Sequence, residues 1–86
     1  MDAVRVLYFA WLRERAGRAV EDIVLPSDVR TVGALMRWLG TRDAGLAEAF
    51  AMPQLVRAAV NQAFASPDTE VQAGDEVAFF PPVTGG

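Results

Sequence analysis

Apolar residues recur along the first part of this chain in the manner of strands. The segment Ala3–Trp11, AVRVLYFAW, is rich in Val, Leu and aromatic residues and predicts a buried strand. The next stretch, LRERAG, predicts a single helical turn closed by Gly17. A second strand is predicted over Ala19–Pro26, where proline ends the pattern. Because the connection is so short, we expect the two strands to pair antiparallel.

The middle of the chain has the spacing of an amphipathic helix. Its apolar positions recur at i, i+3, i+4 and i+7, namely at Val32, Leu35, Met36 and Leu39. Thr31 is the expected N-cap and Gly40 the expected stop. A weaker helical stretch follows at about Ala44–Ala51. The main helix is therefore expected to lie with its apolar stripe on a sheet.

The last third of the chain returns to strand patterns. A third strand is predicted over Leu55–Asn61, with its turn at Asn61 and Gln62. A short extended piece at Glu70–Gln72 and a tight turn at Ala73–Asp75 then lead to a last strand from about Glu76 to Phe80. The predicted order is ββαβββ with a small extra helix.

This order predicts an α+β domain in two layers, with one main helix crossing a mixed sheet of four to five strands. The ubiquitin-like β-grasp has the same plan. If its final strand is central, the chain end should protrude from the body. We therefore expect a β-grasp domain over residues 1–80 and an extended C-terminal tail over residues 81–86.

Composition excludes many kinds of chemistry. The 86 residues fit one domain, and the net charge of −3 offers no basic face for nucleic acid. All eight cations are Arg, and His and Cys are absent, which excludes internal Schiff bases, disulfides, thiolate nucleophiles and metal sites with nitrogen or sulfur ligands. No apolar stretch approaches the roughly 20 residues of a membrane span. We expect a cytoplasmic protein without a bound cofactor.

The tail sequence FFPPVTGG suggests a different kind of reactive group. Pro81 and Pro82 cannot continue a sheet ladder and hold the backbone extended. Six residues from Pro81 could reach about 20 Å. Gly85 and Gly86 lack side chains and can pass a constriction that rejects other residues. Such a tail delivers one reactive group, the α-carboxylate of Gly86.

A carboxylate becomes reactive when ATP converts it to a mixed anhydride with AMP. Attack by a sulfur donor then leaves a thiocarboxylate. A chain without Cys suits this chemistry, because no internal thiol can divert the activated acyl group. The ordinary alternative is a disordered terminus without a function of its own.

The segment GDEVAFFPPVTGG, residues 74–86, closely resembles the C-terminal signature of the molybdopterin synthase small subunit family. VLYFAWLRERAG at 6–17 and AAVNQAF at 58–64 resemble further parts of that family, so the resemblance spans the chain. It implies that a ubiquitin-activating-like adenylyltransferase adenylates Gly86, consuming ATP, and that the residue becomes 1-thioglycine. Gly85 and Thr84 would enter the active site of the large subunit. There the sulfur would pass to cyclic pyranopterin monophosphate and form the molybdopterin dithiolene.

The same resemblance implies a heterotetramer, with two small subunits inserted into a dimer of large subunits. The catalytic side chains would belong to the large subunit. This chain would then be a non-catalytic sulfur carrier in molybdenum cofactor biosynthesis.

Phe79 and Phe80 are adjacent in the last predicted strand and should point to opposite faces of the sheet. One of them is expected to join Pro81, Pro82 and Val83 in an apolar anchor bound by the large subunit. The alternative is that a neighbouring loop of the chain covers it. The predicted partner-binding segment is thus Phe79–Gly85.

Three other functions fit the same pattern. The chain could carry sulfur for thiazole synthesis or tRNA thiolation, or it could be a ubiquitin-like modifier joined to lysines of other proteins. In a different class, it could be an interaction module to which no sulfur is attached.

Overall fold

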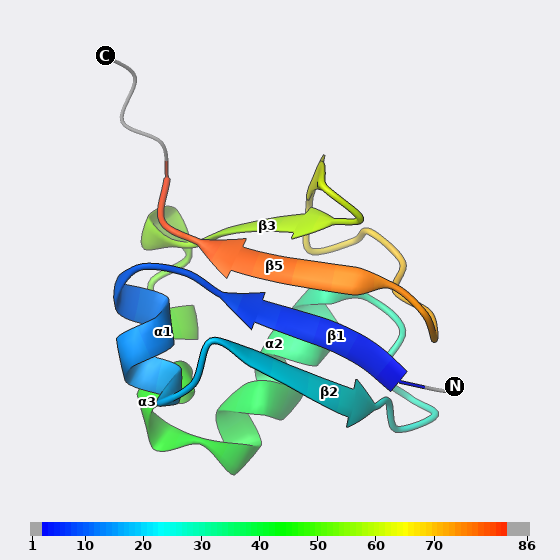
Figure 1. The fold of residues 1–86 in the computed structure, drawn as a ribbon, viewed down its shortest axis with the longest axis horizontal. Coiled ribbons are helices and arrows are strands. Elements are labelled where there is room, and N and C mark those ends of the chain that lie inside the picture. The colour runs from blue at the N-terminus through cyan, green and yellow to red at the C-terminus, as the bar shows by residue number, and fades with distance from the viewer. Residues whose placement is uncertain (1–2, 83–86) are drawn as a thin grey trace.

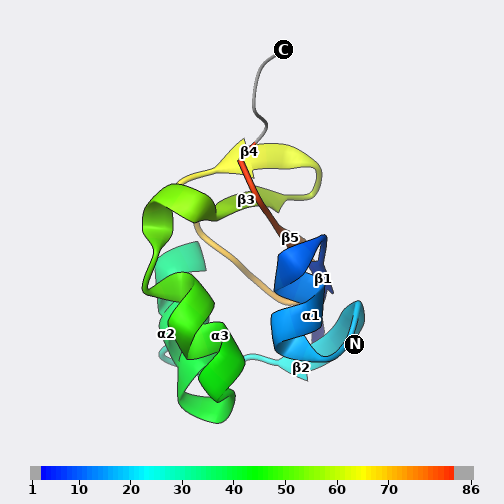
Figure 2. The same cartoon turned by 90° about the vertical axis from the view of Figure 1, so that its left-hand side faces the viewer.

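The computed structural model describes residues 3–82 and contains a five-stranded mixed sheet. Its strands are β1 (Ala3–Tyr8), β2 (Val20–Val24), β3 (Arg57–Val60), β4 (Ala63–Ala65) and β5 (Glu76–Phe80). The strand order is β2-β1-β5-β3-β4, with β1 and β5 parallel and the other pairs antiparallel (Figure 1 and Figure 2). The last strand is therefore central, which is the condition that the sequence analysis set for a protruding chain end.

The helices lie on one side of this sheet (Figure 2). They are α1 (Trp11–Ala16), α2 (Val32–Arg42) and α3 (Ala44–Phe50), with a 3₁₀ turn at Pro53–Leu55. The core between the layers is apolar, and its largest fully buried side chains are those of Tyr8, Phe79, Leu12, Leu35, Leu39 and Leu46. This arrangement confirms the two-layer α+β class and the ubiquitin-like β-grasp plan. Within residues 3–82, no helix is long and apolar enough to cross a membrane.

The main helix begins as predicted but does not end where predicted. The backbone N–H of Ala34 donates to Oγ1 of Thr31 at 3.1 Å, which confirms the N-cap. Gly40 is not a stop, because α2 continues to Arg42. A Cβ at Gly40 would lie 3.3 Å from Cα of Ala47, so this glycine allows α3 to pack closely against α2.

The first strand is shorter than predicted. β1 ends at Tyr8, and Ala10 has a positive φ of 54° that turns the chain out of the sheet. Trp11 consequently begins α1 instead of ending a strand. The glycine cap is confirmed: Gly17 has φ 75°, and its N–H donates to the carbonyl of Arg13.

The fifth strand is not the segment that the sequence predicted. Glu70–Gln72 makes one isolated bridge, to Thr31, because it lies beside the chain that enters α2. The extra strand is instead β4, which pairs with β3 across a turn at Asn61 and Gln62. These two residues have φ values of 50° and 70°, so the predicted turn is confirmed.

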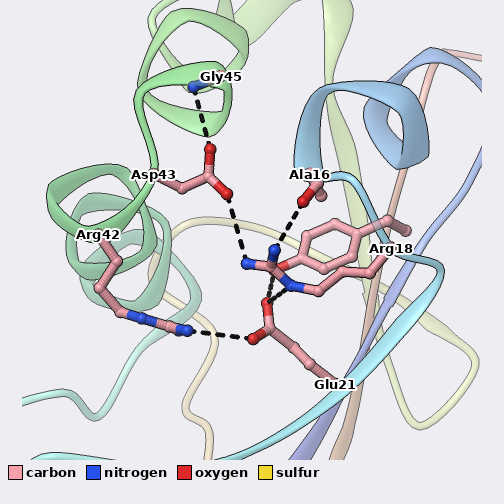
Figure 3. A network of polar contacts seen from close by, with 7 residues as sticks. Ala16, Arg18, Glu21, Arg42, Asp43 and Gly45 are labelled. Carbon is pink, nitrogen blue, oxygen red and sulfur yellow. Dashed lines mark hydrogen bonds and ion pairs between the residues drawn. The ribbon is translucent and has the colours of Figure 1, made fainter.

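A network of polar side chains joins β2 to the helical layer (Figure 3). The Glu21 carboxylate accepts from Oη of Tyr8 at 2.6 Å, Nε of Arg18 at 3.0 Å and Nη2 of Arg42 at 3.2 Å. Arg18 also contacts the Asp43 carboxylate at 3.4 Å. Burial acts to raise the pKa of Glu21, but the hydrogen bonds from Tyr8 and the two arginines outweigh it and leave that pKa below its ordinary value. The carboxylate thus stays charged at neutral pH and links β1, β2 and the end of α2.

Candidate functional site

The strand β5 determines which aromatic side chain is available next to the tail. Its residues alternate, with Val77 and Phe79 fully buried and Phe80 partly exposed on the other face. Phe79 stacks on Tyr8 and packs against Phe50, with ring centroids 6.2 Å and 5.0 Å away. The prediction of opposite faces is confirmed. The inclusion of Phe79 among partner-binding residues is corrected, because its side chain is 0% exposed and belongs to the core.

Phe80 lies on the face of the sheet that is turned away from the helices, here called the outer face. Its ring centroid is 6.0 Å from that of Phe64 on β4, which is 81% exposed. Together they border a cavity of about 400 Å³, here called the aromatic groove. The groove is lined by Arg57, Ala58, Phe64, Ala65, Phe80 and Pro82. An open, largely apolar groove therefore lies where β5 leads into the tail.

The apolar surface continues from this groove across all five strands. Strand register places five side chains in one row, each beside the next on the outer face: Val20, Leu7, Ala78, Ala59 and Phe64. Phe9, which directly follows β1 and is 49% exposed, and Val24 of β2, at 69%, add to the exposed apolar surface. An apolar sheet face that residues 3–82 leave exposed is typical of a protein–protein interface.

Sequence reasoning found Phe80 but missed Phe64. The signal was present in AAVNQAF, because a strand that returns through the turn at Asn61 must place alternate residues on the outer face. Phe64 pairs with Ala59, which itself pairs with Ala78 on β5. A full register assignment would have identified Phe64 as the neighbour of Phe80.

Charges on the outer face are concentrated at the end of the strands opposite to the groove. Nε of Arg5 lies 3.0 Å from the Asp22 carboxylate, and Glu76 pairs with Arg5 in the parallel ladder. The hydrogen bond from Arg5 holds the pKa of Asp22 below its ordinary value. This end of the outer face is therefore polar, whereas the groove end is aromatic.

The remaining predicted site residues are only partly described. Pro81 and Pro82 follow Phe80 and are partly exposed. Val83, Thr84, Gly85 and Gly86 lie outside the described residues, so the roles assigned to them stay predictions. Residues 3–82 contain no group of three or more acidic residues placed to hold a metal ion.

Comparison with known proteins identifies the family. The model of the ThiS family matches residues 6–86 of this chain. The chain belongs to the ThiS family. The molybdopterin synthase sulfur carrier subunit of Escherichia coli K12 is 42% identical over 83 residues, which cover 96% of this chain and 99% of that protein.

Solved structures with the ThiS-family fold include proteins with different names. A molybdopterin converting factor subunit 1, described as putative, from Pyrococcus furiosus has a TM-score of 0.75 at 31% identity, covering 96% of this chain and all of that one. The small archaeal modifier protein SAMP1 of Haloferax volcanii has a TM-score of 0.77 at 29% identity, covering 98% and 99%. A complex of subunits 1 and 2 of molybdopterin-converting factor from Helicobacter pylori matches with a TM-score of 0.61 at 24% identity, covering 98% and 99%. At that identity the last match concerns the fold alone.

Proposed function

We propose that this ThiS-family chain is the sulfur-carrier subunit of a molybdopterin synthase, acting in the cytoplasm. The observation that carries the proposal is the 42% identity, over nearly the whole of both chains, to a protein of that name. The family match also extends to Gly86, so the glycine pair lies within the matched region. The composition supports the proposal, because a chain without Cys has no thiol that could attack its own activated terminus.

The proposed chemistry takes place at one carboxyl group, in two steps. The Gly86 carboxylate attacks the α-phosphorus of ATP on the activating enzyme, which forms an acyl adenylate and releases pyrophosphate. A sulfur nucleophile then attacks the acyl carbon, and AMP leaves with the electron pair of the broken C–O bond. With hydrosulfide as the nucleophile the product is a thiocarboxylate. When its sulfur is passed to cyclic pyranopterin monophosphate in the large subunit, water takes the acyl carbon and restores the Gly86 carboxylate. The carrier itself binds no cofactor in this scheme.

The proposed docking surface is the outer face with its aromatic groove. Phe80, Phe64 and Pro82 border the groove, directly before the segment that would enter the large subunit. Val83, Thr84 and Gly85 would follow the prolines into that active site. A partner that covers the outer face would remove exposed aromatic surface from water, which is a main source of binding free energy at such interfaces. Two such carriers on a dimer of large subunits would form the heterotetramer.

Intact-mass measurement tests the proposed chemistry directly. The chain is incubated with ATP, a ubiquitin-activating-like adenylyltransferase and a sulfide source, and the expected gain equals the replacement of one oxygen by sulfur. A variant that lacks Gly86 is the control and should show no gain. The purified product should then support dithiolene formation when the large subunit and cyclic pyranopterin monophosphate are added. Absence of sulfur on the intact chain, with an activating enzyme proven on another carrier, would refute the proposal and favour an interaction module.

A second candidate function is that of a ubiquitin-like modifier, favoured by the similarity to SAMP1. In that case the activated carboxylate would form isopeptide bonds with lysines of other proteins. This chain contains no Lys, so it could not form isopeptide-linked chains through its own side chains. Adducts on target lysines, found by peptide mass spectrometry, would support the modifier. Sulfur delivery to a thiazole precursor or to tRNA, with none to the pyranopterin, would identify a carrier with a different acceptor.

A further inference from the structure

Arg57 is the charged residue of the aromatic groove. It begins β3 and pairs directly with Phe80 across the antiparallel ladder, so both side chains lie on the outer face. Its exposed side chain lines the groove together with Phe64 and Pro82. The guanidinium is thus placed beside the residues that lead into the proposed reactive tail.

Arg57 has no carboxylate partner within residues 3–82. Its Nη1 donates to the carbonyls of Val56 at 3.2 Å and Pro53 at 3.4 Å, which leaves its other donors without a partner among these residues. Glu76, on the same face, is four residues from Phe80 along β5, roughly 13 Å at the rise of a strand. Among the residues that the structure describes, no carboxylate thus compensates the charge of Arg57 next to this apolar surface.

An uncompensated charge beside an apolar patch limits which partner can cover that patch. A purely apolar partner surface would remove water from the guanidinium without replacing its hydrogen bonds, and that is unfavourable. A partner carboxylate would instead accept two parallel hydrogen bonds from the planar guanidinium. The groove thus fits an anionic side chain next to an apolar one.

We propose that Arg57 determines partner specificity by pairing with an Asp or Glu side chain of the synthase large subunit, seated at the rim of the aromatic groove. This inference rests on the proposed function and names one contact in the interface between this chain and the large subunit. The aromatic residues supply most of the affinity. Arg57 selects, among apolar surfaces, one that presents a carboxylate at this position.

The test measures binding of the unsulfurated chain to the large subunit by calorimetry, at low and at physiological salt. Arg57→Gln removes the charge and is expected to weaken binding about tenfold at low salt, with a smaller loss at high salt. Arg57→Lys keeps the positive charge but lacks the planar guanidinium that donates two parallel hydrogen bonds. Its affinity should therefore lie between those of Arg57→Gln and the wild type. Arg57→Glu should weaken binding more than Arg57→Gln, because it places like charges together.

Arg37→Gln is the matched control. Arg37 is exposed on α2, lines a groove between α2 and α3, and has no ion-pair partner among the described residues. The same change of charge there should leave the affinity unaltered. Thermal unfolding of each variant is measured in parallel, and unchanged unfolding temperatures are expected, because Arg57 is exposed.

Equal affinities of wild type and Arg57→Gln at both salt concentrations would overturn the inference while leaving the proposed function intact. A loss of affinity accompanied by an equal loss in stability would also overturn it, since Arg57 would then act through the fold by its bonds to Pro53 and Val56. If the wild-type chain fails to bind the large subunit at all, this inference is overturned. The proposed chemistry is then judged separately by the intact-mass measurement.

Discussion

At the scale of single residues, Phe79 and Phe80 differ in environment although they are adjacent. Phe79 is fully buried between Tyr8 and Phe50, whereas Phe80 lies on the outer face. We predict that Phe79→Ala lowers the free energy of unfolding by about 3–5 kcal/mol, because it leaves a cavity in the core. Phe80→Ala should cost less than about 1 kcal/mol. Urea denaturation of both variants measures this difference, and similar losses would contradict the assignment of faces.

For the affinity for the large subunit, we predict that the aromatic residues of the outer face matter most, although they contribute little to stability. Phe64→Ala and Phe80→Ala should each weaken binding by about 2 kcal/mol, the range found for aromatic residues at the centre of an interface. Leu55→Ala serves as the control, because Leu55 is 42% exposed but lies in the 3₁₀ turn outside the sheet. Titration calorimetry gives the affinities. Equal effects of all three substitutions would show that the outer face is not the docking surface.

Some residue roles could be predicted from local chemistry alone. Asn61 tolerates a positive φ, and two adjacent aromatic residues in a strand must face opposite ways. Which of the two faces the core depends on the register with β1, where Phe79 pairs with Tyr8. The exposure of Phe64 depends on the pairing of β4. The pairing of Phe79 with Tyr8 joins segments far apart in sequence and is not encoded in any local window, so that assignment needed the structure, whereas Phe64 pairs with Ala59 within one hairpin.

At the scale of elements, the Glu21 network makes stability depend on pH. The pKa of Glu21 is lowered in the folded chain from its ordinary 4.5, so the folded state favours the charged carboxylate. The resulting stabilisation is fully present above the unfolded pKa and is lost as pH falls through the folded one. We predict that Glu21→Gln lowers the free energy of unfolding by about 1–3 kcal/mol at neutral pH.

The same substitution should flatten the decline in stability as pH falls below about 5, because one titrating carboxylate is removed. Denaturant unfolding across this pH range checks both effects. Asp22→Asn is a useful comparison, since the Arg5–Asp22 pair is exposed and should contribute little. A stability profile of Glu21→Gln parallel to that of the wild type would show that the network does not carry the pH dependence.

A second element-scale prediction concerns the contact between α1 and α3. A Cβ at Gly45 would overlap the carbonyl oxygen of Arg15, a backbone atom that cannot move away alone. Gly45→Ala is therefore expected to lower the free energy of unfolding by about 1–3 kcal/mol, despite the better helix propensity of Ala. Gly40→Ala meets a milder contact with Ala47 and should cost less. Thermal unfolding of both variants measures these losses. A Gly45→Ala variant more stable than the wild type would contradict the close approach of Gly45 to the carbonyl oxygen of Arg15.

The start of α2 and the turn between β3 and β4 could be predicted from the sequence, whereas the end of α2 and the position of the fifth strand could not. Thr31 caps α2 and Asn61 turns β3 into β4 through bonds and dihedral angles set within a few residues. Gly40, by contrast, permits a contact between two helices, and the segment Glu70–Gln72 is held by the chain entering α2. Both were assigned from the pattern of their own segment, and both are determined by packing against another element, α3 for Gly40 and the chain that enters α2 for Glu70–Gln72.

At the scale of the whole molecule, the buried core of the described residues ends at Phe79, before the segment to which the reactive group is assigned. The buried core found within residues 3–82 extends from Val4 to Phe79 and includes no residue after Phe79. The chain thus consists of a packed body of sheet and helices, the proposed docking body, followed by the segment that would carry sulfur. Changes to the body and changes to the glycine pair should therefore have separable effects.

Deletion of Gly86 is the clearest case of this separation. We predict that the shortened chain forms no thiocarboxylate and supports no dithiolene synthesis. Its unfolding temperature should shift by less than about 1 °C, since a 1 kcal/mol loss would move a domain of this size by about 4–8 °C. Its affinity for the large subunit should also stay close to that of the wild type if the outer face supplies most of the binding energy. A drop in unfolding temperature similar to that of Phe79→Ala would show instead that the terminal residue stabilises the fold, and the division between docking body and reactive end would be wrong.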